Sequence, residues 1–338
     1  MKAVVLKTQG GPEVLVEEEV PDPTPGPDQV VLKVLACGVC GHDQADRTGL
    51  TKIDLPCILG HEIAGEVVAL GTRARGFQVG DVVACKQFTT CGVCFACRSG
   101  RELDCARRRF NYGGMAEFVA LDDQVLLKVP EGVDPVAASV VACGVGTSYQ
   151  ALAGVGKLVP GEWVAISGAG GGLGVHAVQV AAALGGRVLA VTTSPHKAEF
   201  LRGLGAEHVV VAAEGNVADR LLEATGGQGV HLVLDNVGHP DFFSQGFRAL
   251  RKRGRYVFTG QLYRERVSFY PLFAFSREVV ITGSSSTLMS SFMKAMELVQ
   301  EKRVNPVTET YPLSQASAAH EAMDSRKVVG RAVVIPEA

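Results

Sequence analysis

The pattern of apolar and polar positions changes character at about residue 145. Before it, short apolar runs such as KAVVLK, QVVLKVLAC and AEFVALDD are separated by Gly, Pro and Asp. No long segment of helical periodicity lies between them. Short strands with this turn punctuation predict a β-rich, barrel-like unit over residues 1–144.

From residue 145 onward, predicted strands alternate with segments of helical periodicity. Apolar strands at Trp163–Ser167, Arg187–Thr192 and Val230–Asp235 are separated by helical segments, the first at Leu173–Leu184. This alternation predicts right-handed βαβ crossovers and a doubly wound parallel sheet over residues 145–285. Residues 286–338 offer two helices and a last strand but no core of their own, so we expect them to fold back on the first unit.

Composition and charge exclude several classes of protein. The chain has 338 residues, 47% of them hydrophobic, and 33 Lys and Arg against 35 Asp and Glu give a net charge of -2. This hydrophobic content argues against disorder, and the charge balance against a nucleic-acid or anionic membrane partner. The apolar start before Lys7 is too short for a signal peptide. The uncharged stretch Pro135–Gly156 contains polar residues, which favour a buried core segment over a membrane span. We therefore expect a cytoplasmic protein with no nucleic-acid or membrane partner.

A glycine loop joins the first strand of the second unit to its helix. In Ser167–Gly174, Ala169, Gly171 and Gly174 fit a dinucleotide fingerprint in which Ala replaces the first glycine. Backbone N–H groups near the helix start would face a pyrophosphate; the candidates are Gly168, Gly171, Gly172, Leu173 and Gly174. A tight turn without a ligand is the alternative, but the position at the first strand of a βαβαβ unit favours a dinucleotide site.

The end of the second strand indicates which dinucleotide. After Thr192 no carboxylate appears before Glu199, whereas Thr193, Ser194 and Lys197 offer donors and a positive charge. An adenosine ribose 2′-hydroxyl needs an acceptor there, while a 2′-phosphate needs donors, so the segment favours NADP(H) over NAD(H). Helix capping by Ser194 would explain part of the pattern without a ligand.

Four of the nine cysteines have the spacing of a metal site, Cys91-x2-Cys94-x2-Cys97-x7-Cys105. Four thiolates close a tetrahedral zinc shell, which predicts a structural zinc in a lobe over about residues 86–110. A nucleic-acid-binding zinc knuckle that uses Arg107, Arg108 and Arg109 is an alternative that the net charge disfavours.

A second group of potential ligands is dispersed. Cys40, His61, Glu62 and Cys143 are too far apart in sequence for spacing alone to join them. On that evidence Cys143 could be a core residue and His61 an ordinary buried histidine.

Three motifs in order carry a family resemblance: Gly60-His61-Glu62-x2-Gly65-x-Val67, the four-cysteine lobe and the glycine loop. Along essentially its whole length the chain resembles the zinc-containing alcohol dehydrogenases of the medium-chain dehydrogenase/reductase superfamily. The resemblance implies a GroES-like catalytic domain, residues 1–144 and 286–338, interrupted by a Rossmann domain, residues 145–285, with the active site in the cleft between them.

The resemblance also implies roles for individual residues. Cys40, His61 and Cys143 would hold a catalytic zinc and leave a fourth position open, giving two zinc ions per chain. Glu62 would be the neighbouring glutamate that can approach the metal, and Asp43 would orient the histidine ligand. Arg331 matches a basic position that reaches the cofactor pyrophosphate, unless it is a surface arginine.

The chain departs from the family where a proton relay is expected. The usual hydroxyl residue is replaced by His42, and the usual histidine of the relay by Ala45. Because imidazole titrates near neutral pH, one hypothesis is that His42 exchanges the proton itself. The other is that it only lines the pocket, together with Phe88, Phe110, Tyr112 and Leu262.

These features predict a zinc-dependent NAD(P)(H) alcohol dehydrogenase or carbonyl reductase that acts on a small alcohol, aldehyde or ketone. The second unit is also similar to NADPH-dependent quinone oxidoreductases and acryloyl-CoA-type reductases, so reduction of an activated C=C bond is the alternative. A non-catalytic dinucleotide sensor is a more remote one. The resemblance further implies a homodimer or homotetramer joined through the strand at Glu278–Gly283.

Overall fold

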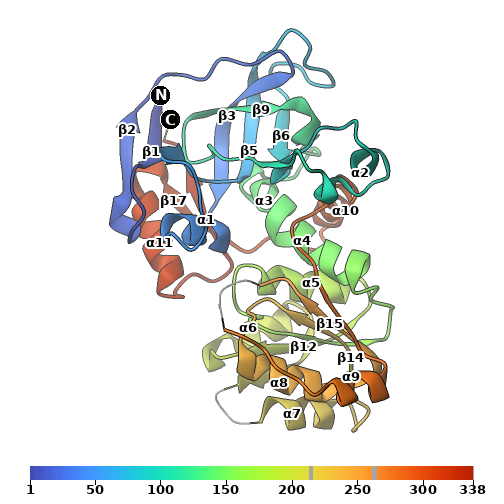
Figure 1. Cartoon of the computed structure of the whole chain (residues 1–338). Coiled ribbons are helices and arrows are strands. Elements are labelled where there is room, and N and C mark those ends of the chain that lie inside the picture. Colours follow the sequence, from blue (N-terminus) through green and yellow to red (C-terminus); the bar gives the residue numbers. More distant parts are fainter. Residues whose placement is uncertain (213–215, 261–264, 338) are drawn as a thin grey trace. The chain divides into compact units, whose positions relative to one another are not determined.

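The computed structural model describes residues 1–212, 216–260 and 265–337. The chain divides into two compact units, each traced in Figure 1. The first consists of Met1–Gly146, Thr287–Gln300 and Pro306–Ala338, and the second of Thr147–Ser286 and Glu301–Asn305. None of the helices in the described ranges is long and apolar enough to cross a membrane.

A seven-stranded sheet forms the centre of the first unit, in the order β10-β6-β5-β3-β18-β17, with β9 also paired to β3. Its strands are β3 (Gln29–Gly38), β5 (Glu62–Leu70), β6 (Val82–Cys85), β9 (Phe118–Asp122), β10 (Leu126–Lys128), β17 (Thr308–Pro312) and β18 (Arg331–Ile335). Smaller sheets pair β2 (Leu15–Glu19), β1 (Lys2–Leu6) and β4 (Cys57–Ile58), and β7 (Phe88–Thr89) with β8 (Arg109–Phe110). Leu32, Ile63 and Met115 are fully buried in the core between the elements. The predicted β-rich unit is confirmed.

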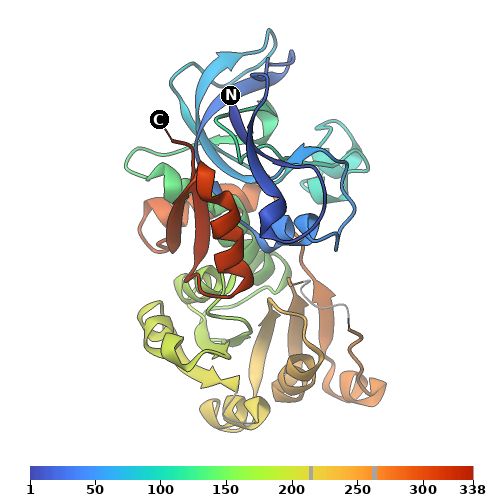
Figure 2. The same cartoon turned by 90° about the vertical axis from the view of Figure 1, so that its left-hand side faces the viewer.

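The C-terminal segment completes this first unit. Strand β18 pairs antiparallel with β3, placing Val334 opposite Cys37. Figure 2 shows β17, β18 and the helix α11 (Ala316–Asp324) beside the N-terminal strands. The first unit also contains the helices α1 (Gly41–Arg47), α2 (Phe95–Arg98), α3 (Pro135–Ser139) and α10 (Met289–Gln300).

Residues 135–156, expected only to be buried, form a succession of helical turns. After α3 come the π-helix η4 (Val141–Val145), α4 (Gly146–Tyr149) and a second π-helix, η5 (Gln150–Val155). Because π-turns are uncommon and occur often at functional sites, η4, which carries Cys143, stands out.

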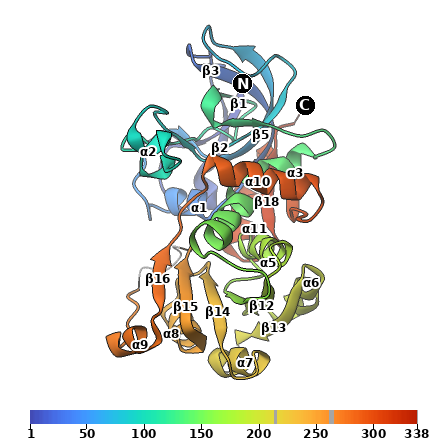
Figure 3. The ribbon, with the colours of Figure 1, turned by 90° about the vertical axis from the view of Figure 1, so that its right-hand side faces the viewer.

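The second unit contains the predicted parallel sheet. Its six strands lie in the order β13-β12-β11-β14-β15-β16, with β16 at one edge (Figure 3). They are β11 (Trp163–Ile166), β12 (Arg187–Thr192), β13 (Ala206–Val211), β14 (Val230–Asp235), β15 (Leu250–Phe258) and β16 (Val280–Gly283), and the helices are α5 (Gly174–Ala183), α6 (Ala198–Gly203), α7 (Val217–Ala224), α8 (Pro240–Ala249) and α9 (Pro271–Arg277). All neighbouring strands are parallel. The strand order reverses between β11 and β14, which is where α/β sheets of this kind bind ligands.

Residues 301–305 belong to the second unit and not, as expected, to the first. The side chain of Gln179 in α5 bonds both the amide and the carbonyl of Asn305, at 2.8 and 2.9 Å. Arg303 also donates to the carbonyl of Ala183. These contacts depend on side chains distant in sequence, so periodicity could not show them.

A histidine in α11 lies where burial disfavours its charged form. His320 is fully buried, and within the described part of the chain neither ring nitrogen has a hydrogen-bond partner. Burial lowers the pKa of His320 to about 4, while the charges of Asp43, Arg47 and Asp324 act on it in opposing directions. The folded chain therefore holds this side chain neutral at pH values where the unfolded chain protonates it.

We predict that the free energy of unfolding falls as the pH drops from 6.5 towards 4, because the unfolded state then binds the additional proton. His320 should account for about 2 kcal/mol of the loss between pH 7 and pH 5. In His320→Leu this part of the loss should disappear, whereas replacing the exposed His196 by Gln should retain it. Urea unfolding at the two pH values measures the difference, and an equal loss in all three proteins would contradict the prediction.

Candidate metal centre and dinucleotide site

The four lobe cysteines come together as a thiolate cluster. The sulfur atoms of Cys91, Cys94, Cys97 and Cys105 lie within 4.8 Å of one another. Cys91 is 3.9 Å from Cys97 and 3.6 Å from Cys105, and Cys94 is 3.5 Å from Cys97. A tetrahedron with zinc–sulfur bonds of 2.3 Å has edges of about 3.8 Å, so the cluster has the dimensions of a closed zinc site.

The dispersed candidates also meet, because strand pairing brings their segments together. Strands β3 and β5 pair with Gly38 opposite Glu62, which places the start of α1 beside the start of β5. Donor atoms of Cys40, His61, Glu62 and Cys143 lie within 4.8 Å of one another, with the two sulfur atoms 3.7 Å apart. A hydrogen bond from the Cys143 thiol lowers the pKa of Cys40, and the charge of Arg331 lowers it further. This cluster offers two soft sulfur donors, one imidazole and one carboxylate.

Asp43 fixes the histidine of this cluster. Its carboxylate lies 3.1 Å from Nδ1 of His61 and also accepts the backbone N–H groups of Cys40 and Gly60, at 2.9 and 3.1 Å. Burial raises the pKa of Asp43, but His61 and the Cys40 amide together lower it below its usual value, which favours the ionised carboxylate. An ionised carboxylate at Nδ1 holds the proton on that nitrogen and leaves Nε2 available as a metal ligand.

Glu62 and Arg331 form a buried ion pair next to the ligands. Their side chains are almost fully buried, with 3.2 Å between a carboxylate oxygen and the guanidinium. Neither carboxylate oxygen has a hydrogen bond of good geometry within the described residues. Burial raises the pKa of Glu62 to about 7, against the effect of Arg331. Arg331 is thus not a surface arginine; its charge faces the cluster of potential metal ligands in the first unit.

His42 lies against the aromatic side chains beside the cluster. Its ring stacks on that of Phe110, with 4.5 Å between the ring centroids. The Phe110 centroid also lies 4.6, 4.6 and 4.7 Å from the ring centroids of His61, Phe88 and Tyr112. Phe110 therefore links the other expected pocket residues. Leu262 is outside the described residues.

A buried carboxylate that the sequence analysis missed lies behind His42. Asp46 is fully buried, lies 3.6 Å from Nε2 of His42, and accepts hydrogen bonds from Thr51 and, at 2.8 Å, from Tyr112. The i,i+4 spacing of His42 and Asp46 on a helix was the available signal. The arrangement gives His42 a carboxylate partner within the protein.

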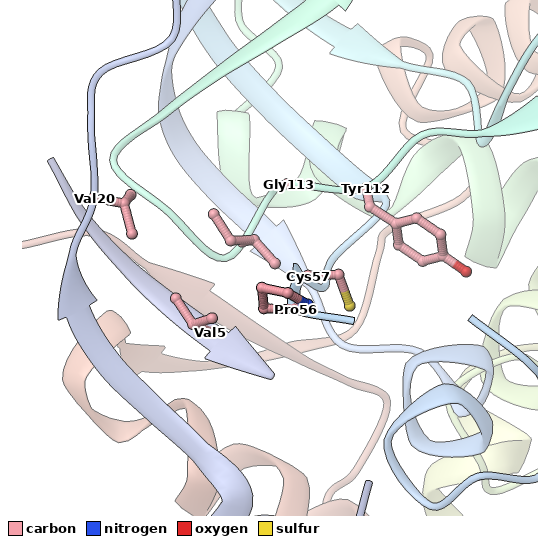
Figure 4. A pocket seen from close by; sticks show the side chains of 7 residues that line it. Val5, Val20, Pro56, Cys57, Tyr112 and Gly113 are labelled. Atoms are coloured by element: carbon pink, nitrogen blue, oxygen red, sulfur yellow. The ribbon is translucent and has the colours of Figure 1, made fainter. Parts of the chain in front are cut away.

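Tyr112 also borders a separate apolar pocket of about 410 Å³ in the first unit. Its lining residues are Val5, Val20, Pro56, Cys57, Ile58, Tyr112 and Gly113 (Figure 4). Cys57 is half-buried here, whereas Cys37 and Cys85, the two other cysteines outside both clusters, are fully buried. The lining has no charged side chain, and the Tyr112 hydroxyl is bonded to Asp46.

The glycine loop turns tightly between β11 and α5. Gly168 has a φ of 57°, and the Gly171 amide bonds the Gly168 carbonyl at 2.9 Å. A Cβ at Gly174 would lie 2.1 Å from that same carbonyl oxygen, so the helix start can reach the loop only with glycine there. Leu173 is the N-cap of α5, so the helix begins at the loop and its N-terminus can face an anion.

Lys197 uses its charge differently from the sequence expectation. The side chain is buried and its ammonium donates to the Gly170 carbonyl of the loop at 3.0 Å; burial lowers its pKa. Thr193 is exposed and Ser194 half-buried. The strand ends at Thr192, whose hydroxyl accepts the Ser194 amide at 3.1 Å and lies under the loop. Thr192 is thus a second residue that sequence reasoning missed.

A buried carboxylate also fastens the loop from below at the reversal of strand order. Asp235 accepts the Ser167 hydroxyl at 2.6 Å, the Tyr256 hydroxyl at 2.8 Å and the amides of Val237 and Gly238 at 3.0 Å. These bonds tie the start of the glycine loop to the loop after β14.

Comparison with known proteins gives the family. Residues 26–131 match the model "Alcohol dehydrogenase GroES-like domain", and residues 172–301 match "Zinc-binding dehydrogenase". The chain is 33% identical to the acryloyl-coenzyme A reductase of Sulfurisphaera tokodaii, covering 99% of this chain and 100% of that one. It is also 33% identical to an NAD-dependent alcohol dehydrogenase of Saccharolobus solfataricus, with the same coverage.

Solved structures agree with this assignment. The crystal structure of a protein named AibC matches with a TM-score of 0.94 and 36% identity, covering 100% of this chain and 96% of that chain. The chain belongs to the zinc-binding alcohol dehydrogenase family of the medium-chain dehydrogenase/reductase superfamily, and it is an oxidoreductase. Its first unit has the GroES-like fold and its second the Rossmann fold.

We predict that Gly174→Ala disrupts the glycine loop, because the added Cβ would collide with backbone atoms of Gly168 and Ala169. Affinity for NADPH should fall about tenfold or more. Gly203→Ala is the matched control, since nothing lies within 4 Å of a Cβ there. Fluorescence titration with NADPH measures both variants, and equal affinities would show that the loop does not bind the dinucleotide.

Proposed function

We propose that the protein is a zinc-dependent NAD(P)(H) alcohol dehydrogenase or carbonyl reductase acting on a small alcohol, aldehyde or ketone. The observation that carries the proposal is the partly buried cluster of Cys40, His61 and Cys143 beside Glu62. Two thiolates and one imidazole suit zinc and leave one position of a tetrahedron for a substrate oxygen. Zinc held there would act as a Lewis acid on a carbonyl oxygen.

The chain's own residues would prepare that site. Asp43 keeps the His61 ring oriented, and Arg331 balances the charge of Glu62 while the three ligands are engaged. Phe110 covers the imidazoles of His42 and His61, which excludes water from one side of the cluster. His42, with Asp46 behind it, would hold the proton exchanged with the substrate.

For the coenzyme, NADP(H) is favoured over NAD(H). Nicotinamide supplies or accepts the hydride. The strand end presents the hydroxyl of Thr192 where a ribose-binding carboxylate would be expected, followed by Thr193 and Ser194. Lys197 would contribute its charge to a 2′-phosphate only by giving up its bond to Gly170. Arg331, which faces Glu62, is proposed to contact the pyrophosphate as well.

A second candidate is an NADPH-dependent 2-enoyl or quinone reductase. It is supported by the replacement of the relay hydroxyl by His42 and by the similarity to acryloyl-coenzyme A reductase. A carbonyl conjugated to a C=C bond can accept hydride at the β-carbon, so the same cluster could serve either reaction.

We also propose that the protein is a homodimer or homotetramer joined through the edge strand β16. Val280 on this strand is 53% exposed, and Leu272 and Phe275 on the adjacent α9 are 65% and 81% exposed. An exposed edge with neighbouring apolar side chains is a surface that soluble proteins usually cover.

Zinc content tests the main proposal. The unmodified chain should carry about two zinc ions, and Cys143→Ala about one, with turnover reduced at least about 100-fold. Cys57→Ala, a cysteine outside both clusters, should retain both. Assays with NADPH and NADH on aldehydes, ketones and 2-enoyl thioesters identify the reaction. One zinc in every protein would overturn the zinc-dependent reading, and turnover of only the enoyl thioester would favour the second candidate.

We predict that His42→Asn lowers turnover about 100-fold while zinc content stays unchanged, since asparagine cannot carry the proton. Added imidazole should restore part of the rate. His208→Asn, at an exposed position on β13, is the control. A His42→Asn enzyme with unaltered turnover and pH profile would show that His42 only lines the pocket.

A further inference from the structure

The base of the cysteine lobe is a buried polar cluster rather than an apolar one. The side chain of Asn111 accepts a hydrogen bond from the Thr89 hydroxyl at 2.7 Å and donates one to the carbonyl of Lys86 at 2.8 Å. The backbone N–H of Asn111 donates to the Gln87 carbonyl at 2.8 Å. These bonds hold β7 and the residues before it to the chain that leaves β8. Every partner in this cluster is buried.

Two hydrogen bonds run from the lobe and its base towards Cys143. Nε2 of Gln87 donates to the carbonyl of Ala142, the residue before Cys143, at 3.2 Å. Glu102, three residues before the lobe ligand Cys105, accepts the backbone N–H of Met289 at 2.6 Å. Met289 is the first residue of α10, and α10 packs against the π-helix η4 that carries Cys143.

The Glu102 contact is held in place from within the lobe. Lys86 is almost completely buried and lies 3.4 Å from the same carboxylate. Burial raises the pKa of Glu102, but the amides of Met289 and Glu102 and the charge of Lys86 together lower it below its usual value, which favours the ionised carboxylate. An ionised acceptor at the first amide of a helix also complements the positive end of the helix.

The two short helices of the lobe contribute little to its stability. Neither α2 nor the short helix at Glu102–Asp104 contains a buried residue. Because these two helices bury no side chain, we expect the lobe to depend on its metal for its fold, and the position of Glu102 to depend on occupancy of the four-cysteine site.

We infer that the two metal sites of the first unit are coupled through Glu102. Metal in the four-cysteine lobe places Glu102 on the start of α10, and α10 supports the π-helix that presents Cys143. Glu102 is a positioning residue for a ligand that it does not touch. The inference rests on the proposed zinc site at Cys40, His61 and Cys143 for its functional meaning, but the mechanical link is separate from it.

The variants follow from these contacts. Glu102→Ala removes the acceptor, whereas Glu102→Gln keeps an oxygen for the Met289 amide. Asp104→Ala is the matched control, because Asp104 lies in the same lobe, is exposed, and among the described residues forms its ion pair only with Arg101 on the surface, at 3.8 Å. Cys94→Ser disables the lobe's metal site directly.

Amide hydrogen exchange measured by mass spectrometry tests the link itself. In Glu102→Ala and Cys94→Ser, exchange should rise at residues 141–146 and 289–293 relative to β3 of the same protein. In Asp104→Ala and Glu102→Gln it should stay at the level of the unmodified chain. If these segments exchange no faster relative to β3 in Glu102→Ala, the inference is wrong.

Zinc affinity at the dispersed site tests its consequence, by competition with a chromophoric chelator. Glu102→Ala should weaken this affinity about 10- to 100-fold, and Asp104→Ala should stay within about twofold of the unmodified chain. Cys94→Ser combined with Glu102→Ala should be no weaker than either alone, since both break one link; additive losses would overturn the coupling. A chain that binds one zinc would refute the proposed function, and the exchange measurement would still decide the link.

Discussion

The candidate site depends first on the antiparallel pairing of β3 with β5. That register sets Gly38 opposite Glu62, so the chain leaving β3 and the chain entering β5 deliver Cys40 and His61 to the same place. A shift by one residue would turn every side chain of β5 to the other face of the sheet. Asp43 then secures the arrangement, because one carboxylate bonds the histidine ring and the backbone on both sides of the cluster. Fold and ligand geometry thus have a common origin.

The fold and part of the site could be predicted from the sequence because their signals are local. Alternating strands and helices give the parallel sheet, and four cysteines within fifteen residues, numbers 91 to 105, give a metal lobe. Cys40 and Cys143 are 103 residues apart, and only family resemblance joined them. Spacing carries no information about ligands that tertiary structure brings together.

What could not be predicted consists mostly of side chains that act on other side chains. Asp46 behind His42, and Thr192 and Asp235 beneath the glycine loop, are ordinary polar residues until the fold buries them. Lys197 has the charge that suits a phosphate, yet its ammonium donates to the Gly170 carbonyl within the glycine loop. A residue type gives chemical capacity, and packing decides how that capacity is used.

The π-helix that carries Cys143 has a consequence for sequence change. A π-turn is an α-helical turn with one residue added, and each residue of an α-helix advances the direction of its side chain by about 100°. Deleting any one residue before Cys143 in Val141–Val145 would restore ordinary helix and turn this thiol away from Cys40. The direction of this thiol therefore depends on the length of the turn as well as on the presence of the cysteine.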